Sequence, residues 1–269
     1  MERKINFLPG LVVVMLSMLL FWGCATTDDK KEGRAPDPGV LRVGVTCNYY
    51  PLIFKNKNRE IAGLEVDFAY GLAAYLERTV QLVELNWDDL IPALRDNRID
   101  IIMSGMSMTN ARQIKIAFAN PYYKSGQMVL VSKDPKFKLI NDFDKLFTQS
   151  ITMDIGVIGD TTGEMFVRSA FPLAKSIVRF KDQRKAANAL ISGKIDAFVH
   201  DAPSILMIYA EYETKGLRIV MSLMTEEYLA WGMTKKNKNL QRKANQYLNM
   251  LKTENKLRPI VEKWMPSLR

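Results

Sequence analysis

The chain has 269 residues, with 38 Lys or Arg against 29 Asp or Glu and a formal net charge of +9. No helix-turn-helix or zinc-finger spacing accompanies the positive charge, so we expect no nucleic-acid partner. Two cysteines and one histidine, His200, are too few for a disulfide framework or a zinc site, and we expect no metal and no cofactor.

The first 23 residues are typical of an export signal. Arg3 and Lys4 precede an apolar run from Phe7 to Trp22, which is shorter than the ~20 residues of a spanning helix. The run ends in "FWGC", which resembles the lipobox of bacterial lipoproteins and implies a lipid on Cys24. Because Trp22 is bulky for a lipobox, an uncleaved anchor is the alternative. Both place the folded part outside the cytoplasm, in the periplasm or on the outer cell surface.

Residues 24–39 are polar, charged and interrupted by two prolines, and we expect a disordered tether. The tether joins the membrane to a globular part that starts at Val40, roughly 230 residues long, enough for one large domain or two lobes. With Cys24 lipidated, Cys47 has no disulfide partner and is expected to be a small buried residue.

Strand-like and helix-like segments alternate from residue 40, which indicates βαβ units and a mainly parallel sheet. The first set has strands at 41–46, 79–85 and 99–105 and helices at 64–78, 87–97 and from Thr109. After an extended run at 126–136, a second set has strands at 150–157, 176–180 and 195–201 and helices at 161–170, 182–193 and 203–216. An extended stretch at 217–235 and an amphipathic helix at 239–257 close the chain.

Two α/β sets joined by two extended crossings predict two lobes with a hinge. We expect the crossings near residues 128–132 and 222–228. One lobe then comprises residues 40–130 and 224–269, and the other comprises residues 131–223. Ligands of open α/β sheets bind at the carboxyl ends of strands, so the cleft between the lobes is the expected site.

The segment after the 99–105 strand is "SGMSMTNAR", in which Arg112 lies near Ser104 and Ser107. A guanidinium group offers a planar fork of donors that fits a carboxylate. The alternatives are a surface arginine, with Ser107 or Thr109 capping the helix that follows.

The second set has polar groups at its strand ends as well. Thr161 and Thr162 begin a helix whose free N–H groups suit an anion, although Thr161 and Glu164 also fit a capping box. Asp201 is either a helix cap or a carboxylate for an ammonium group. Tyr49 and its neighbour Tyr50 offer flat apolar walls or core packing. A carboxylate clamp on one lobe and an ammonium acceptor on the other predict a site for a free α-amino acid.

Six segments in this order and spacing resemble the family-3 extracellular solute-binding proteins, the polar amino acid receptors of ABC importers. They are "LRVGVTCNYYPLIF", "IAGLEVDFAYGLAAYL", "NWDDLIPALRDNRIDIIMSGMSMTNARQ", "FANPYYKSGQMVLV", "GVIGDTTGE" and "GKIDAFVHDAPS". The resemblance implies a two-lobed α/β periplasmic-binding-protein fold (Venus flytrap, type II), a monomer, and an ABC permease as partner.

The resemblance also implies residue roles. Arg112 pairs with the ligand α-carboxylate, the turn at Thr162 adds an N–H, and Tyr49 stacks on the ligand side chain. The α-ammonium group is held by Gly105, Ser107 and Asp201.

Three positions depart from the family pattern. Thr46 stands where several binders of cationic side chains carry aspartate, which argues against Lys, Arg or His as ligand. Leu52 replaces a frequent aromatic residue. Asp160 replaces the usual glycine and adds negative charge at the anion end.

An enzymatic alternative shares the fold. Periplasmic cyclohexadienyl dehydratases are similar at "DTTGEMF", where Glu164 aligns with their acidic residue, although Gly163 replaces the neighbouring Asn. In an apolar cleft a raised pKa would make Glu164 a general acid for prephenate or arogenate. The capping box explains the same glutamate without catalysis.

Overall fold

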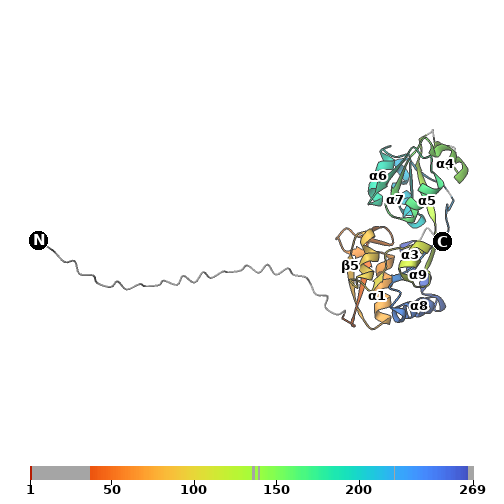
Figure 1. The fold of residues 1–269 in the computed structure, drawn as a ribbon. Coiled ribbons are helices and arrows are strands. Elements are labelled where there is room, and N and C mark those ends of the chain that lie inside the picture. The colour runs from red at the N-terminus through yellow and green to blue at the C-terminus, as the bar shows by residue number, and fades with distance from the viewer. Residues whose placement is uncertain (2–36, 135–136, 139, 221, 266–269) are drawn as a thin grey trace. The chain divides into compact units, whose positions relative to one another are not determined.

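The computed structural model describes Met1 and residues 37–265, apart from 135–136, 139 and 221 (Figure 1). The predicted signal peptide, the lipidated Cys24 and most of the tether therefore lie outside the described residues. By its internal contacts the chain divides into Met1–Ala35 and Pro36–Arg269, and the second unit holds every element below. Within the described part of the chain, no helix has the length and hydropathy of a membrane span.

The first lobe is built on a five-stranded sheet in the order β5-β1-β6-β15-β7. Strand β1 pairs in parallel with β5 and β6, and β15 pairs antiparallel with β6 and β7. The strands are β1 (Val40–Val45), β5 (Thr79–Glu84), β6 (Ile101–Ile102), β7 (Ala117–Phe118) and β15 (Gly232–Met233). The helices of this lobe are α1 (Leu64–Tyr75), η1 (Trp87–Asp89), α2 (Leu90–Arg95), α3 (Asn110–Lys115), α8 (Lys238–Thr253) and α9 (Leu257–Trp264).

Strand β1 shows why this sheet is buried on both faces. Leu41, Val43 and Val45 are at most 1% exposed and belong to the apolar core that includes residues of α1 and α8. On the other face, a Cβ atom at Gly44 would lie 2.3 Å from Ile99, so only glycine allows that close packing. The carboxyl ends of β1 and β6 consequently come together at one edge of the sheet.

A small sheet of β2 (Asn48–Tyr49), β3 (Ile53–Lys55) and β4 (Ile61–Ala62) follows β1. Cys47, just before it, is free and partly buried, and it packs against the core rather than lying fully inside it. Burial raises the pKa of its thiol to about 11, and Glu84 adds to the shift, so the thiol stays protonated.

The second lobe has its own five-stranded sheet, in the order β11-β10-β12-β9-β13. Helices α4, α5, α6 and α7 surround it (Figure 1). The strands are β9 (Gln127–Ser132), β10 (Asp154–Ile158), β11 (Ser176–Phe180), β12 (Ala197–Asp201) and β13 (Leu217–Val220). The helices are α4 (Phe143–Ser150), α5 (Thr162–Ala170), α6 (Gln183–Ile191), α7 (Ala202–Tyr212) and η3 (Glu213–Lys215).

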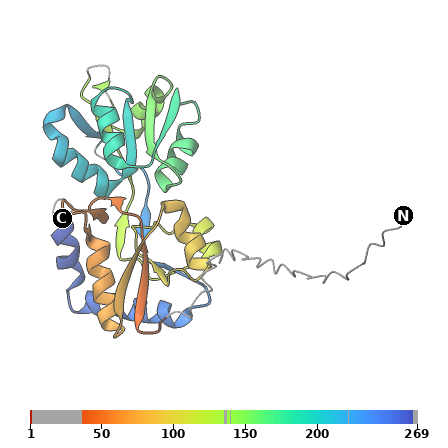
Figure 2. The same ribbon diagram turned by 90° about the vertical axis from the view of Figure 1, so that its left-hand side faces the viewer.

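The two lobes are joined by an antiparallel pair of short strands, β8 (Tyr123–Ser125) and β14 (Glu227–Leu229) (Figure 2). This pair moves the first crossing upstream of the expected 128–132, because β9 already pairs with β12 and β13. Residues 127–130, expected in the first lobe, are thus part of the second sheet. The second crossing coincides with the expected 222–228.

Three expected elements differ in the structure. Helix α4 was missed and occupies the start of the expected 150–157 strand, so that β10 begins only at Asp154. The expected 239–257 helix ends at Thr253, because Asn255 takes a left-handed conformation with φ 55° before α9 begins. Strand β6 is only two residues long, since the chain turns at Gly105 with φ 66°.

Candidate ligand-binding site

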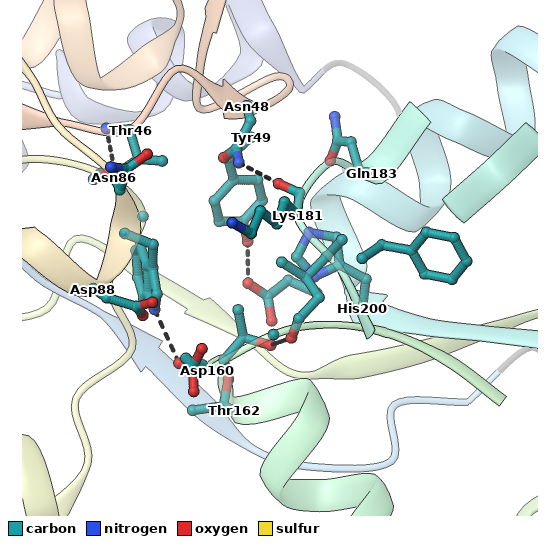
Figure 3. Close-up of a pocket in the computed structure, with 18 of the residues that line it drawn as sticks. Thr46, Asn48, Tyr49, Asn86, Asp88, Asp160, Thr162, Lys181, Gln183 and His200 are labelled. Carbon is teal, nitrogen blue, oxygen red and sulfur yellow. Dashed lines mark hydrogen bonds between the residues drawn. The ribbon is translucent and has the colours of Figure 1, made fainter. Parts of the chain in front are cut away.

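A cavity of about 480 Å³ lies between the two lobes and is lined by the loops that follow their strands. The predicted site residues all line it: Tyr49, Ser104, Gly105, Ser107, Arg112, Thr161, Thr162 and Asp201. Its wall also includes Thr46, Asn86, Asp88 and Asp160, which Figure 3 shows on the side away from Gln183. The lining is a geometric fact, whereas the binding roles of these residues remain predictions.

The first-lobe floor of the cavity is a tight turn at the end of β6. Ser104 Oγ accepts a hydrogen bond of 3.0 Å from the N–H of Thr46, which ties this turn to the end of β1. A Cβ atom at Gly105 would lie 2.6 Å from the ring of Tyr49, so glycine lets the ring lie flat on the turn. The turn and the tyrosine ring therefore form one surface.

Arg112 is partly buried on the short helix α3. Thr109 caps this helix, since its Oγ1 accepts a hydrogen bond of 3.2 Å from the backbone N–H of Arg112. One guanidinium nitrogen donates to the Ser107 carbonyl at 2.8 Å, and the group lies 5.2 Å from the centre of the Trp87 ring. No carboxylate of the described residues forms an ion pair with it. Burial lowers the pKa of Arg112, and Asp201 and Glu227 act against that shift. Its remaining donors can bind an incoming anion.

Asp201 is 6% exposed and ends β12 on the opposite lobe. Its two carboxylate oxygens accept short hydrogen bonds from the hydroxyl of Tyr49, drawn as a dashed line in Figure 3, and from the side-chain amide of Gln127. The carboxylate is therefore engaged away from the helix that follows, which argues against the capping alternative. Burial raises the pKa of Asp201 and Glu227 adds to the shift, while His200, Tyr49 and Gln127 lower it.

The start of helix α5 forms the second-lobe wall opposite Arg112. Thr161 caps the helix, with its Oγ1 3.5 Å from the N–H of Glu164. Thr162 Oγ1 accepts a 3.2 Å bond from Gln127. The first N–H groups of α5 have no partner within the helix, which suits an anion.

Glu164 does not line the cavity and is held on the helix side of the turn. It accepts from the Asp160 N–H at 2.7 Å and pairs with Arg168 at 2.7 Å and Arg179 at 3.1 Å. Burial alone would raise the pKa of Glu164, but these three partners outweigh it and lower the pKa. The pKa of Glu164 is thus lowered, whereas the general-acid alternative needs a raised pKa at this position.

The departure at Asp160 is explained by the same cluster. Asp160 takes the left-handed conformation with φ 61° that glycine usually supplies, so the turn keeps its shape. Its carboxylate pairs with Arg179 at 2.5 Å. The extra negative charge at the anion end is thus offset within the lobe.

Hydrogen bonds between the lobes surround the cavity. Trp87 Nε1 donates to the Asp160 carbonyl at 2.9 Å, and Asn48 donates to the Lys181 carbonyl at 2.6 Å. The Ser204 hydroxyl donates to the Tyr50 carbonyl at 2.9 Å. Since Tyr49 and Asp201 add a further bond, the structure represents the closed arrangement of the two lobes.

Several lining residues were not predicted from sequence. Like the predicted residues, these lie near the carboxyl end of a strand: Trp87, Asp88, Arg179, Lys181 and His200. Trp87 was assigned only to an amphipathic helix, although it lies three residues after the end of β5. The buried Gln127 gave no signal, because it begins the extended run that was expected to be a crossing.

Glu65 supports the site from beneath and is 1% exposed. It accepts from the Gly105 N–H at 2.7 Å, from the Tyr122 hydroxyl at 2.7 Å and from Trp231 Nε1 at 3.0 Å. Tyr122 directly precedes β8 and Trp231 directly precedes β15, so one carboxylate ties the Gly105 turn to both chain segments beside the hinge. Burial raises the pKa of Glu65 to about 7, although its three donors lower it in part.

The Glu65→Gln variant tests this buried carboxylate. A pKa raised from 4.5 to about 7 means that the folded state holds a proton that the unfolded state releases in this range. The contribution of Glu65 to the free energy of unfolding should therefore fall by on the order of 3 kcal/mol as the pH rises through that window. Urea unfolding measures the free energy of unfolding of wild type and variant at pH 5 and pH 8. From pH 5 to pH 8, wild type should lose about that much stability relative to Glu65→Gln. A pH-independent difference would contradict the shifted pKa.

Comparison with known proteins gives consistent matches. The family described as bacterial extracellular solute-binding proteins, family 3, matches residues 41–267. The L-arginine-binding protein of Pseudomonas aeruginosa is 26% identical over 274 residues, covering 97% of this chain and 96% of the relative. The cyclohexadienyl dehydratase of the same organism is 30% identical over 176 residues, covering 65% and 63%.

A solved structure matches the fold. The crystal structure of the ancestral amino acid-binding protein AncCDT-1, described as a precursor of cyclohexadienyl dehydratase, has a TM-score of 0.76 and 33% identity. The match covers 84% of this chain and 96% of that one. The expected fold class, an α/β two-lobed type II periplasmic binding fold, is confirmed.

Proposed function

The chain belongs to the bacterial extracellular solute-binding proteins of family 3, and we propose that it captures a free α-amino acid between its lobes and delivers it to an ABC import permease. The main support for an amino acid as ligand is the placement of Arg112 and Asp201 on opposite lobes of one cavity. A guanidinium group that has no carboxylate partner among the described residues and a buried carboxylate complement the two charges of an amino acid.

The binding mechanism follows from the two walls. The ligand carboxylate pairs with Arg112, and closure brings the first N–H groups of α5 near Thr162 onto the same carboxylate. The ligand ammonium group bonds to Asp201 and to groups of the Gly105 turn. Its side chain runs along the rings of Tyr49 and Trp87, which line the cavity. Closing the lobes excludes water, which strengthens both charge pairs.

The partner and the location are part of the proposal. A lipid on Cys24 and a tether over residues 24–39 would keep a monomeric receptor near a permease, outside the cytoplasm. The relatives support the ligand class, since they include an L-arginine-binding protein and an ancestral amino acid-binding protein.

A dehydratase activity has less support. The dehydratase relative shows that the family includes an enzyme. In this chain Glu164 is paired with two arginines and lies outside the cavity lining, so it lacks both the raised pKa and the access that an acid catalyst needs.

A melting-temperature panel tests the proposed function. The purified protein is heated with each common amino acid, and with prephenate and arogenate. A ligand at about 1,000 times its dissociation constant adds ~4 kcal/mol, which corresponds to a rise of roughly 8–16 °C for a chain of this size. We expect such a rise with one amino acid or a related few. A response to prephenate or arogenate alone would favour the enzyme, and no response at all would refute the amino acid site.

The Arg112→Ala variant tests the carboxylate clamp. Removing one partner of a buried charge pair weakens binding by about 2–5 kcal/mol, or roughly 30-fold to several thousand-fold. Titration calorimetry with the amino acid found in the panel measures the loss. The control is Arg258→Ala, which removes an exposed arginine that pairs with Glu262 on α9. Equal affinity in wild type and Arg112→Ala would exclude the clamp.

A further inference from the structure

Two neighbouring glutamates, Glu227 at the start of the crossing strand β14 and Glu226 just before it, have different surroundings. Glu226 is exposed and contacts Lys124 at 2.9 Å and the Tyr228 hydroxyl at 2.5 Å. Glu227 is partly buried, and the Gln127 amide connects it to Asp201 of the cavity lining. Its Oε1 accepts from Thr225 at 2.9 Å, and its buried Oε2 has no hydrogen-bond partner among the described residues. A second carboxylate therefore lies behind the site.

The side-chain amide of Gln127 joins Glu227 to the predicted ammonium acceptor. This fully buried amide donates to Asp201 Oδ1, to Glu227 Oε1 at 2.9 Å and to Thr162 Oγ1 at 3.2 Å. An amide nitrogen carries only two hydrogens, so these three acceptors share them. An ammonium group that bonds to Asp201 would release one of those hydrogens to the other acceptors. The ammonium end of the cavity thus contains two linked carboxylates.

The charges at this end do not balance. Asp201 and Glu227 carry two negative charges, and Arg112 carries one positive charge. Burial lowers the pKa of Arg112, and both carboxylates act against that shift. At the rim, Arg179 pairs with Asp160. Burial and Asp160 raise the pKa of Asp88, whereas Arg179 and Lys181 lower it. These two cations at the rim of the cavity therefore have acidic neighbours of their own. A zwitterion brings one charge of each sign and leaves one negative charge uncompensated.

We propose that Glu227 is a specificity-determining residue, and that its carboxylate, linked to Asp201 through Gln127, selects amino acids with a net positive charge. The inference rests on the proposed function and names the class of its ligand. Several binders of cationic side chains carry an aspartate at the position of Thr46, and this chain does not. We infer that Glu227 on the crossing strand supplies the negative charge instead. Ligands with a second carboxylate add to the excess and are disfavoured.

The test compares ligands of the same shape and different charge. L-Arginine and L-citrulline differ by the charge of the side-chain end group, and L-ornithine and L-norvaline form a second pair. Titration calorimetry measures both pairs with wild type, Glu227→Gln and Glu226→Gln. The two variants lose the same charge from adjacent positions of the chain, so Glu226→Gln is the matched control. Glutamine keeps the size of Glu227 and an oxygen that accepts from Gln127, and a thermal melt verifies that the variant is folded.

We expect wild type to bind the cationic member of a pair at least about tenfold more tightly than the neutral one. Glu227→Gln should reduce that ratio roughly 3–10-fold, whereas Glu226→Gln should leave it unchanged. A merely structural role for Glu227 would weaken both ligands equally and keep the ratio, which would overturn the inference.

Two other outcomes separate this inference from the proposed function. Preference of wild type for neutral or acidic amino acids would refute the charge selection while an amino acid receptor still stands. Binding of no α-amino acid by wild type would refute the proposed function itself.

Discussion

The structure depends on keeping two opposite charges apart across a closed cleft. Within the part of the chain that the structure describes, the Arg112 side chain on one lobe donates to one backbone carbonyl, and Asp201 on the other lobe accepts from two neutral donors. A direct ion pair between Arg112 and Asp201 would neutralise both groups, and neither would then be available to a charged ligand. Because both groups line one cavity, a ligand that carries both charges can offset the loss of hydration of each of them.

The fold supplies this separation by aligning strand ends. Each lobe has a mixed sheet rather than the expected mainly parallel one, with two parallel and two antiparallel strand pairings. The carboxyl ends of the parallel strands meet the cavity, so Tyr49, Gly105 and Asp201 come from distant parts of the chain to one place. Glu65 fixes the Gly105 turn to both chain segments beside the hinge, and Gln127 fixes Asp201 to the crossing strand. The binding groups are thereby connected to the segments that must move when the lobes open.

Much of this arrangement could be predicted from sequence, and the part that could not has a physical reason. The alternation of strands and helices predicted both lobes, and residues at strand ends, such as Arg112 and Thr162, lie on the cavity as expected. Glu227 was missed because its role depends on which face of β14 turns inward, and that face is set by pairing with β8. The lowered pKa of Glu164 was not expected, because Arg179 on β11 approaches it only in the folded lobe and adds to Arg168, one turn along the same helix.

The most direct test of the account measures the ammonium acceptor. The affinities of wild type and Asp201→Asn are compared for the preferred amino acid and for its des-amino analogue, which lacks only the ammonium group. The account predicts that Asp201→Asn weakens the amino acid roughly tenfold or more and leaves the des-amino analogue unchanged or tighter. Equal losses for both ligands would show that Asp201 only supports the fold, and the zwitterion site would be wrong.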